Sequence, residues 1–142
     1  PGETEAPNGL QRGLRVANRL QDLLTDRFAP GRTGNEVLSA TLEAAEAEGI
    51  DATIYSHPIG LHGHAAGPLI GLWDQQGGVP GRGDVPLRPN TAHSIELNAA
   101  VDVPEWGGQE VLFRLEEDAI FTGEEVRYLD GRQTQLYLIP RQ

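Results

Sequence analysis

The fold is decided by residues 94–121, which read SIELNAAVDVPEWGGQEVLFRLEEDAIF. Apolar and polar residues alternate through this stretch, and a segment containing Pro and Gly interrupts the alternation at residues 104–108. Such alternation is typical of strands that bury one face and expose the other. We therefore expect strands at Ser94–Val103 and Gln109–Glu116, followed by a short strand at Ala119–Phe121.

Two carboxylates occupy corresponding positions on these strands. Strand alternation sends Ile95 and Leu97 to one face of the first strand and Glu96 to the other. On the second strand, Leu115 faces the core and Glu116 faces away from it. We therefore expect Glu96 and Glu116 to lie side by side at one cleft. Two bare carboxylates that close repel each other and raise one pKa, and a divalent cation removes this penalty.

Two helices are expected before these strands. Apolar residues recur at three- and four-residue steps over Leu10–Phe28, which indicates an amphipathic helix that a Pro-Gly pair ends. Thr33 and Glu36 have the spacing of a capping box, in which each side chain accepts a backbone N–H of the other residue. The second helix then continues through Ala45, and Gly49 is expected as its left-handed C-cap.

The remaining segments complete an α+β pattern. A short strand is expected at Ala52–Ser56, and a long ordered loop at Trp73–Asn90, which holds four Gly and three Pro. Further strands are expected at Val126–Leu129 and Gln135–Ile139, and residues 1–8 resemble a linker. Helices followed by several strands predict two helices packed on one face of a mainly antiparallel sheet.

The composition narrows the possible functions. The chain has 142 residues, which suits a single domain, and a formal net charge of −10, which argues against binding to nucleic acid or to an anionic membrane. Because Cys is absent, disulfides and thiolate metal sites are excluded. No apolar run is long enough for a membrane helix, and the first residues lack the basic and then apolar pattern typical of a signal peptide. We expect a soluble protein, cytoplasmic or exported, and the sequence does not choose between these compartments.

Three of the four histidines lie within residues 57–64. Imidazole is the commonest metal ligand in proteins, and the glycines between these histidines let a backbone approach a substrate closely. A surface loop that is rich in His by chance is the alternative. We favour a functional role because only one histidine lies outside this segment.

These motifs resemble those of the pita-bread metallopeptidases. The resemblance rests on His57-Pro58-Ile59-Gly60, on His64 seven positions after His57, on Ser94-Ile95-Glu96, and on Leu115-Glu116 leading into Asp118–Thr122. This family includes methionine aminopeptidases, Xaa-Pro aminopeptidases, prolidases and creatinase. The resemblance implies the C-terminal part of a pita-bread fold and the hydrolysis of peptide bonds by water activated at two divalent metal ions.

The resemblance also implies a role for each matching residue. His57 corresponds to the histidine metal ligand, and His64 to a second histidine that contacts the substrate and the tetrahedral intermediate. Glu96 corresponds to a metal ligand that also serves as the acid–base group, and Glu116 to the glutamate that bridges the metals. Glu117 is an alternative to Glu116, although strand parity favours Glu116. The implied cofactors are divalent ions such as Mn, Zn or Co, and the implied partner is a peptide substrate.

The family also uses two aspartates that precede the histidine. Here the candidates are Asp22, Asp26 and Asp51, which lie on or beside the predicted helices. Because the initiating Met is also missing, we expect residues 1–142 to be an incomplete, C-terminal portion of a longer catalytic domain, inactive alone. We also expect self-association, or a complementary chain that covers an exposed face. A non-catalytic module that binds peptides or proteins is the alternative, favoured by Leu97 where the family usually has Pro.

Overall fold

The structure, a computed structural model, describes residues 5–139. Both helices precede all the strands, as the sequence predicts. Half of the predicted linker at residues 1–8 lies outside the described residues, and its last residue already belongs to a helix. The elements in chain order are α1 (Asn8–Thr25), α2 (Gly34–Ala47), β1 (Asp51–Ile54), β2 (His57–Pro58), β3 (Thr91–Val103), the 3-10 helix η1 (Pro104–Trp106), β4 (Gln109–Phe121) and β5 (Val126–Tyr128).

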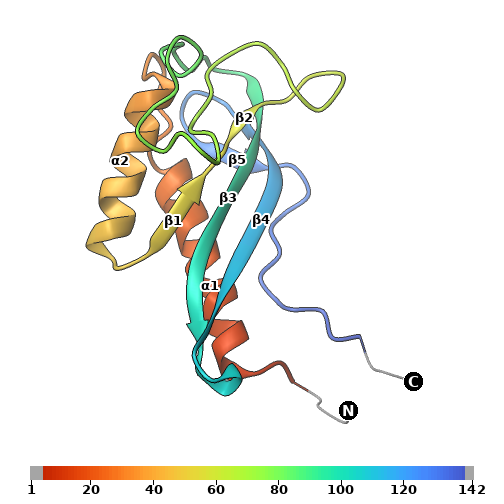
Figure 1. The fold of residues 1–142 in the computed structure, drawn as a ribbon. Helices are drawn as coiled ribbons and strands as arrows, with labels where there is room; N and C mark the ends of the chain where they lie inside the picture. Colours follow the sequence, from red (N-terminus) through yellow and green to blue (C-terminus); the bar gives the residue numbers. More distant parts are fainter. Residues whose placement is uncertain (1–4, 140–142) are drawn as a thin grey trace.

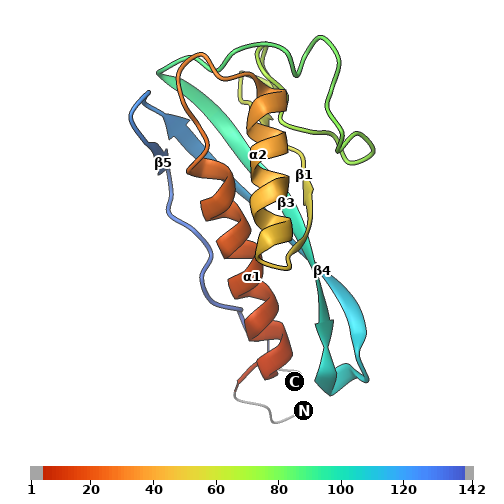
Figure 2. The same cartoon turned by 90° about the vertical axis from the view of Figure 1, so that its left-hand side faces the viewer.

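The strands form one antiparallel sheet in the order β1-β3-β4-β5, and the short strand β2 pairs with β3 beyond the end of β1. The two long strands β3 and β4 form a hairpin at the centre of this sheet (Figure 1). Both helices cover the same face of the sheet, and within residues 5–139 no helix lies over the opposite face (Figure 2). The predicted architecture, two helices on a mainly antiparallel sheet, is confirmed.

The hydrophobic core lies between the helices and the sheet. The stripe predicted on α1 is buried there, together with the inward-facing residues of the strands. Helix α1 approaches the sheet so closely at Gly13 that a Cβ atom there would lie 2.0 Å from the Phe113 ring. The largest fully buried apolar side chains are Leu20, Leu24, Leu38, Ile54, Leu69, Ile70, Leu87, Ile95, Leu97 and Phe121.

The predicted ends of α2 are confirmed. The Glu36 carboxylate accepts the backbone N–H of Thr33 at 2.7 Å, and the Thr33 hydroxyl accepts the backbone N–H of Glu36 at 3.2 Å. These two bonds satisfy amides that otherwise lack partners at a helix start. At the other end, Gly49 adopts φ 69°, the left-handed conformation that favours glycine after a helix.

Two expectations about strands are wrong. The strand β4 continues without a break from Gln109 to Phe121, because the polar residues Glu117 and Asp118 also pair with residues of β3. The segment Gln135–Ile139 is not a strand. It lies beyond Arg132, whose guanidinium donates to the side chain of Asn18 on α1, so the chain is held along the helix and not beside another strand.

The fourth histidine, His93, is buried in the core. Its side chain is 1 % exposed, and its ring packs edge-on against Phe28 at a centroid distance of 5.2 Å. Its Nε2 atom lies 3.0 Å from the hydroxyl of Thr91, whereas Nδ1 has no hydrogen-bond partner within the described residues. Burial, and secondly the nearby His57, lower the pKa of His93 to about 4.

The segments that the structure describes, residues 5–139, include no helix with the length and apolar character required to cross a membrane.

His93 should make the folded chain sensitive to acid. An unfolded histidine titrates near pH 6.5, so below this pH the unfolded chain binds a proton that the folded chain, with its lower pKa, does not. Stability is therefore fully present above pH 6.5 and is lost as the pH falls towards 4. Between pH 7 and pH 5, urea denaturation should show a loss about 2 kcal/mol larger for the unaltered chain than for His93→Gln.

The exposed histidine His62 provides the matched control, because His62→Gln should leave the pH dependence of the unaltered chain unchanged. Parallel stability curves for His93→Gln and the unaltered chain would contradict the assignment of this acid sensitivity to His93.

Candidate functional site

Glu96 on β3 and Glu116 on β4 stand directly opposite each other in the sheet. Their sequence neighbours Leu97 and Leu115 are buried in the core, so alternation turns both carboxylates to the face without helices. The Glu96 side chain is 19 % exposed, and the Glu116 carboxylate accepts a hydrogen bond from the Ser94 hydroxyl at 3.2 Å. The predicted side-by-side arrangement is confirmed.

Glu117 points to the opposite face of the sheet. It stands opposite the buried Ile95, and its carboxylate accepts the backbone N–H of Gln133 at 3.0 Å. Its side chain therefore helps to fix the segment after β5 and does not face the cleft. The structure thus places Glu116, and not Glu117, beside Glu96.

His57 lies at the edge of the same site. It occupies β2 opposite Ser94, its side chain is 4 % exposed, and its Nε2 atom is 3.6 Å from a carboxylate oxygen of Glu96. Its Nδ1 atom is 3.1 Å from the Pro58 carbonyl, and since a carbonyl only accepts, Nδ1 carries the proton of this bond. In the neutral ring, the Nε2 lone pair is therefore the group nearest the Glu96 carboxylate.

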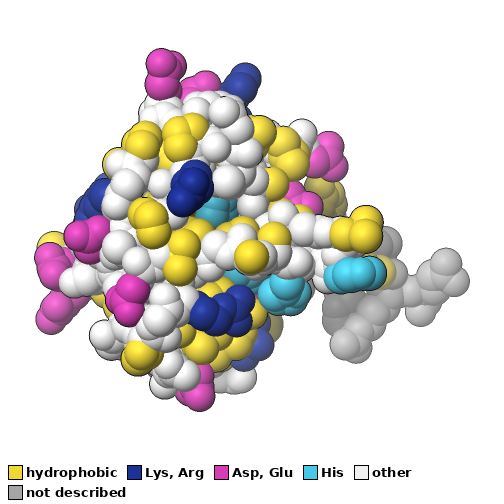
Figure 3. All heavy atoms as spheres, turned by 90° about the horizontal axis from the view of Figure 1, so that it is seen from above, with side chains coloured by type: hydrophobic (Ala, Val, Ile, Leu, Met, Phe, Trp, Pro, Cys, Tyr) yellow, Lys and Arg dark blue, Asp and Glu magenta, His cyan; other side chains and the backbone are white. Residues whose placement is uncertain are grey.

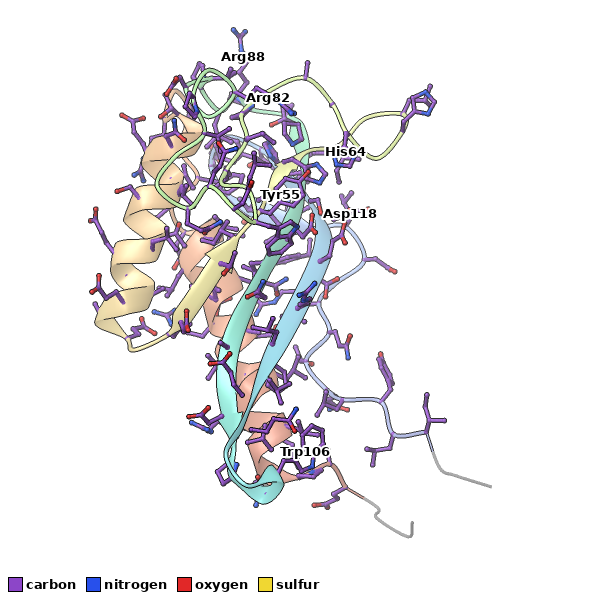
Figure 4. All side chains as sticks on the ribbon, viewed as in Figure 1. Tyr55, His64, Arg82, Arg88, Trp106 and Asp118 are labelled. Carbon is purple, nitrogen blue, oxygen red and sulfur yellow. The ribbon has the colours of Figure 1, made fainter. Side chains whose placement is uncertain are left out.

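His64 lies directly against His57. The two imidazole rings stack with a centroid distance of 4.1 Å and an angle of 12° between their planes. The hydroxyl of Tyr55 is 3.3 Å from Nε2 of His64, and Figure 4 shows these two side chains together at one end of the sheet. Seen from above, histidines reach the surface on and beside the projecting loop (Figure 3). His62 is exposed, whereas His57 and His64 stack on each other, so two of the three clustered histidines lie together at the site.

A cavity of about 250 Å³ opens beside the two glutamates. Trp73, from the long loop, forms one wall, and the guanidinium carbon of Arg114 lies 6.0 Å from the centre of its ring. The cavity therefore combines an aromatic surface and a cation with the two carboxylates. Its lining residues are Trp73, Glu96, Leu97, Arg114, Leu115 and Glu116.

The electrostatics of the site penalise its negative charge. Burial raises the pKa of Glu96, and the facing carboxylate of Glu116 raises it further, while His64 opposes these effects. A proton or a cation at this position would remove the repulsion between the two carboxylates.

The donor chemistry suits a divalent cation, since one imidazole nitrogen and two carboxylates are ordinary ligands of Zn²⁺ and Mn²⁺. Even so, no three His, Asp or Glu side chains among residues 5–139 are arranged as a group that would hold an ion. The side chains therefore match a divalent cation in the type of their donor atoms and in their closeness, but they do not form a complete set of ligands.

The three upstream aspartates do not complete the site. Asp22 bonds to Arg132 and Asp26 caps α1, so both belong to the helix layer. Asp51 stands opposite Ala100, four residues along β3 from Glu96, or about 13 Å at the rise of a strand. These positions, on or beside the helices, are the ones that the sequence predicts for them.

Sequence reasoning missed three residues around the site. Tyr55 lies two positions before His57, and because side chains two apart in extended chain share a face, alternation was a usable signal for it. Trp73 lies in the long loop, and nothing in the sequence places it at the glutamates. Alternation puts Arg114 on the same face as Glu116, but its contact with Trp73 depends on the loop conformation.

Comparison with known proteins identifies the fold. No protein-family model and no curated protein matches the chain. Among solved structures, the X-Pro aminopeptidase from Thermotoga maritima MSB8 matches 94 % of this chain and 33 % of its own, with 20 % identity and a TM-score of 0.62. The Xaa-Pro dipeptidase from Bacillus anthracis matches 95 % and 34 %, with 20 % identity and a TM-score of 0.63.

A third match is the N-terminal domain of the FACT complex subunit SPT16 from Cicer arietinum, at 13 % identity and a TM-score of 0.64 over 89 % of this chain and 29 % of that chain. The chain thus has the pita-bread fold of Xaa-Pro aminopeptidases and prolidases, as the sequence predicted. It spans about a third of the length of these proteins.

The repulsion between the two glutamates predicts that Glu96→Gln stabilises the metal-free chain at pH 7, by up to about 1 kcal/mol, the size of a like-charge pair across strands. The pKa of Glu96 is raised in the folded chain, so the folded chain binds a proton on this carboxylate more tightly than the unfolded chain does. The destabilisation caused by the charged carboxylate therefore disappears as the pH falls through that pKa. Urea denaturation in EDTA should therefore show the two stabilities converging in acid.

Glu46→Gln, at an exposed position of α2, is the control and should change stability little at any pH. A Glu96→Gln chain less stable than the unaltered chain at pH 7 would contradict the predicted repulsion.

Proposed function

We propose that this chain supplies the histidine and glutamate half of a metal-dependent peptidase site of the Xaa-Pro aminopeptidase and prolidase type. In this proposal His57, Glu96 and Glu116 are metal ligands, and His64 contacts the peptide. The ions are divalent, with Mn, Zn and Co as candidates. The fold is shared with such peptidases over most of this chain, which supports the proposal.

The observation that carries the proposal is the meeting of His57 and Glu96. The Nε2 lone pair of the neutral imidazole and a carboxylate oxygen lie 3.6 Å apart, and a second carboxylate stands directly across the strands. Electron-rich groups gain nothing from such proximity unless a proton or a cation lies between them. The bond from Nδ1 to the Pro58 carbonyl has the form that orients metal-binding histidines in proteins.

Each residue has a distinct task in the proposed reaction. When bound, the divalent ions would polarise the scissile carbonyl and lower the pKa of a water molecule, so that the water loses a proton more readily and becomes a better nucleophile. Glu96, whose pKa is raised, is suited to take the proton of that water and pass it to the leaving amine. His64 donates a hydrogen bond to the substrate oxygen, and the wall formed by Trp73 and Arg114 shields one side of the peptide from water.

The alternative function is a peptide- or protein-binding module without catalysis. It is favoured by the absence, among residues 5–139, of a complete metal-binding group. In that case the same cavity would bind a peptide, and the carboxylates would bind no ion. Self-association, or pairing with a complementary chain, is part of both proposals.

Glu116 and Glu117 form a matched pair for testing metal binding. Since Glu116 stands opposite Glu96 while Glu117 faces the other side of the sheet, Glu116→Gln should weaken the binding of Mn²⁺ or Zn²⁺ about tenfold or more, and Glu117→Gln should leave it unchanged. Isothermal titration calorimetry of the 142-residue chain measures both, and His57→Ala should behave like Glu116→Gln.

The two proposals give different results in this titration. No heat of binding in the unaltered chain, or equal binding in the Glu116 and Glu117 variants, would reject the metal site and favour the binding module. Urea denaturation of each variant without metal checks that a lost affinity is not a lost fold.

A further inference from the structure

We propose that Tyr55 is a positioning residue for His64: its hydroxyl donates to Nε2 of His64 and so holds this ring, stacked on His57, in the form that carries its proton on Nδ1. The tautomer of His64 is inferred from contacts within this chain alone. Its consequence for a peptide rests on the proposed function: in this tautomer, Nδ1–H is the group that His64 offers to a substrate.

The geometry places Tyr55 at the centre of the aromatic cluster. Its hydroxyl is 3.3 Å from Nε2 of His64, and its ring centroid lies 5.2 Å from that of His57 and 5.5 Å from that of Trp73, with which it packs edge to face. Because Tyr55 follows β1 and its backbone N–H donates to the carbonyl of Glu96, its main chain is fixed to the sheet. His64, in contrast, lies on an exposed loop.

The direction of the bond between Tyr55 and His64 follows from the chemistry of the two groups. A phenol hydroxyl, with a pKa near 10, is a strong neutral donor, and an unprotonated imidazole nitrogen is a strong acceptor. We therefore take the hydroxyl as donor and Nε2 as acceptor. A neutral imidazole carries one proton, so this proton is on Nδ1.

The other ring of the stack, His57, has the same tautomer for a different reason. His57 carries its proton on Nδ1 because the Pro58 carbonyl accepts there. His64 carries its proton on Nδ1 because Tyr55 occupies Nε2. The two stacked rings thus share one tautomer through two different partners, and Tyr55→Phe changes only that of His64.

The test is a long-range ¹H–¹⁵N correlation spectrum of the ¹⁵N-labelled chain at pH 8 in EDTA, with neither metal nor peptide present. We expect His64 of the unaltered chain to show the Nδ1–H pattern. Tyr55→Phe keeps the ring and removes the hydroxyl, and it should shift the tautomer ratio of His64 about fivefold towards Nε2–H, as the loss of one hydrogen bond predicts.

Tyr137→Phe is the matched control, because Tyr137 is 84 % exposed and should leave the spectrum of His64 unchanged. The Nε2–H form of His64 in the unaltered chain would overturn the proposal, even if Tyr55→Phe does not fold. An unchanged tautomer ratio in a folded Tyr55→Phe chain would also overturn it. Since no ion or peptide is used, failure of metal binding in the Glu116 titration rejects the proposed function and leaves this result standing.

Discussion

The antiparallel register between β3 and β4 is the constraint on which the site depends. It sets Glu96 opposite Glu116, and it also sets the buried Leu97 opposite Leu115. Because side chains alternate with a period of two, a slip of one residue along either strand would turn its glutamate towards the helices and its leucine towards solvent. The same register of the hairpin therefore decides which side chains are buried and where the two carboxylates lie.

Two features of the chain hold that register. The hairpin closes through η1, and the two residues that follow, Gly107 and Gly108, adopt φ 70° and φ 79°, which only glycine does readily. Helix α1 then locks the inner face, where the absence of a side chain at Gly13 lets the Phe113 ring press against the helix. With both helices on one face, the other face is left for polar side chains and for the long loop that brings Trp73 to them (Figures 1 and 2).

Local patterns in the sequence predicted most of this fold. Alternation located β3 and the two glutamates, helical periodicity and a capping box located α1 and α2, and parity distinguished Glu116 from Glu117. Patterns failed where the outcome depended on distant partners. The segment Gln135–Ile139 alternates like a strand, but it lies along α1, where Arg132 is anchored to Asn18, and not beside another strand. The stacking of His57 and His64 likewise depends on how a glycine-rich loop folds back, which spacing alone does not determine.

The central claim is that His57, Glu96 and Glu116 together bind a divalent cation on the uncovered face of the sheet. Anomalous diffraction from crystals of the chain soaked in Mn²⁺ tests it most directly, because it locates the ion. The predicted result is an anomalous peak within coordination distance of His57 Nε2 and of both carboxylates. A map with no peak there, or with its strongest peak at another group of side chains, would contradict the claim.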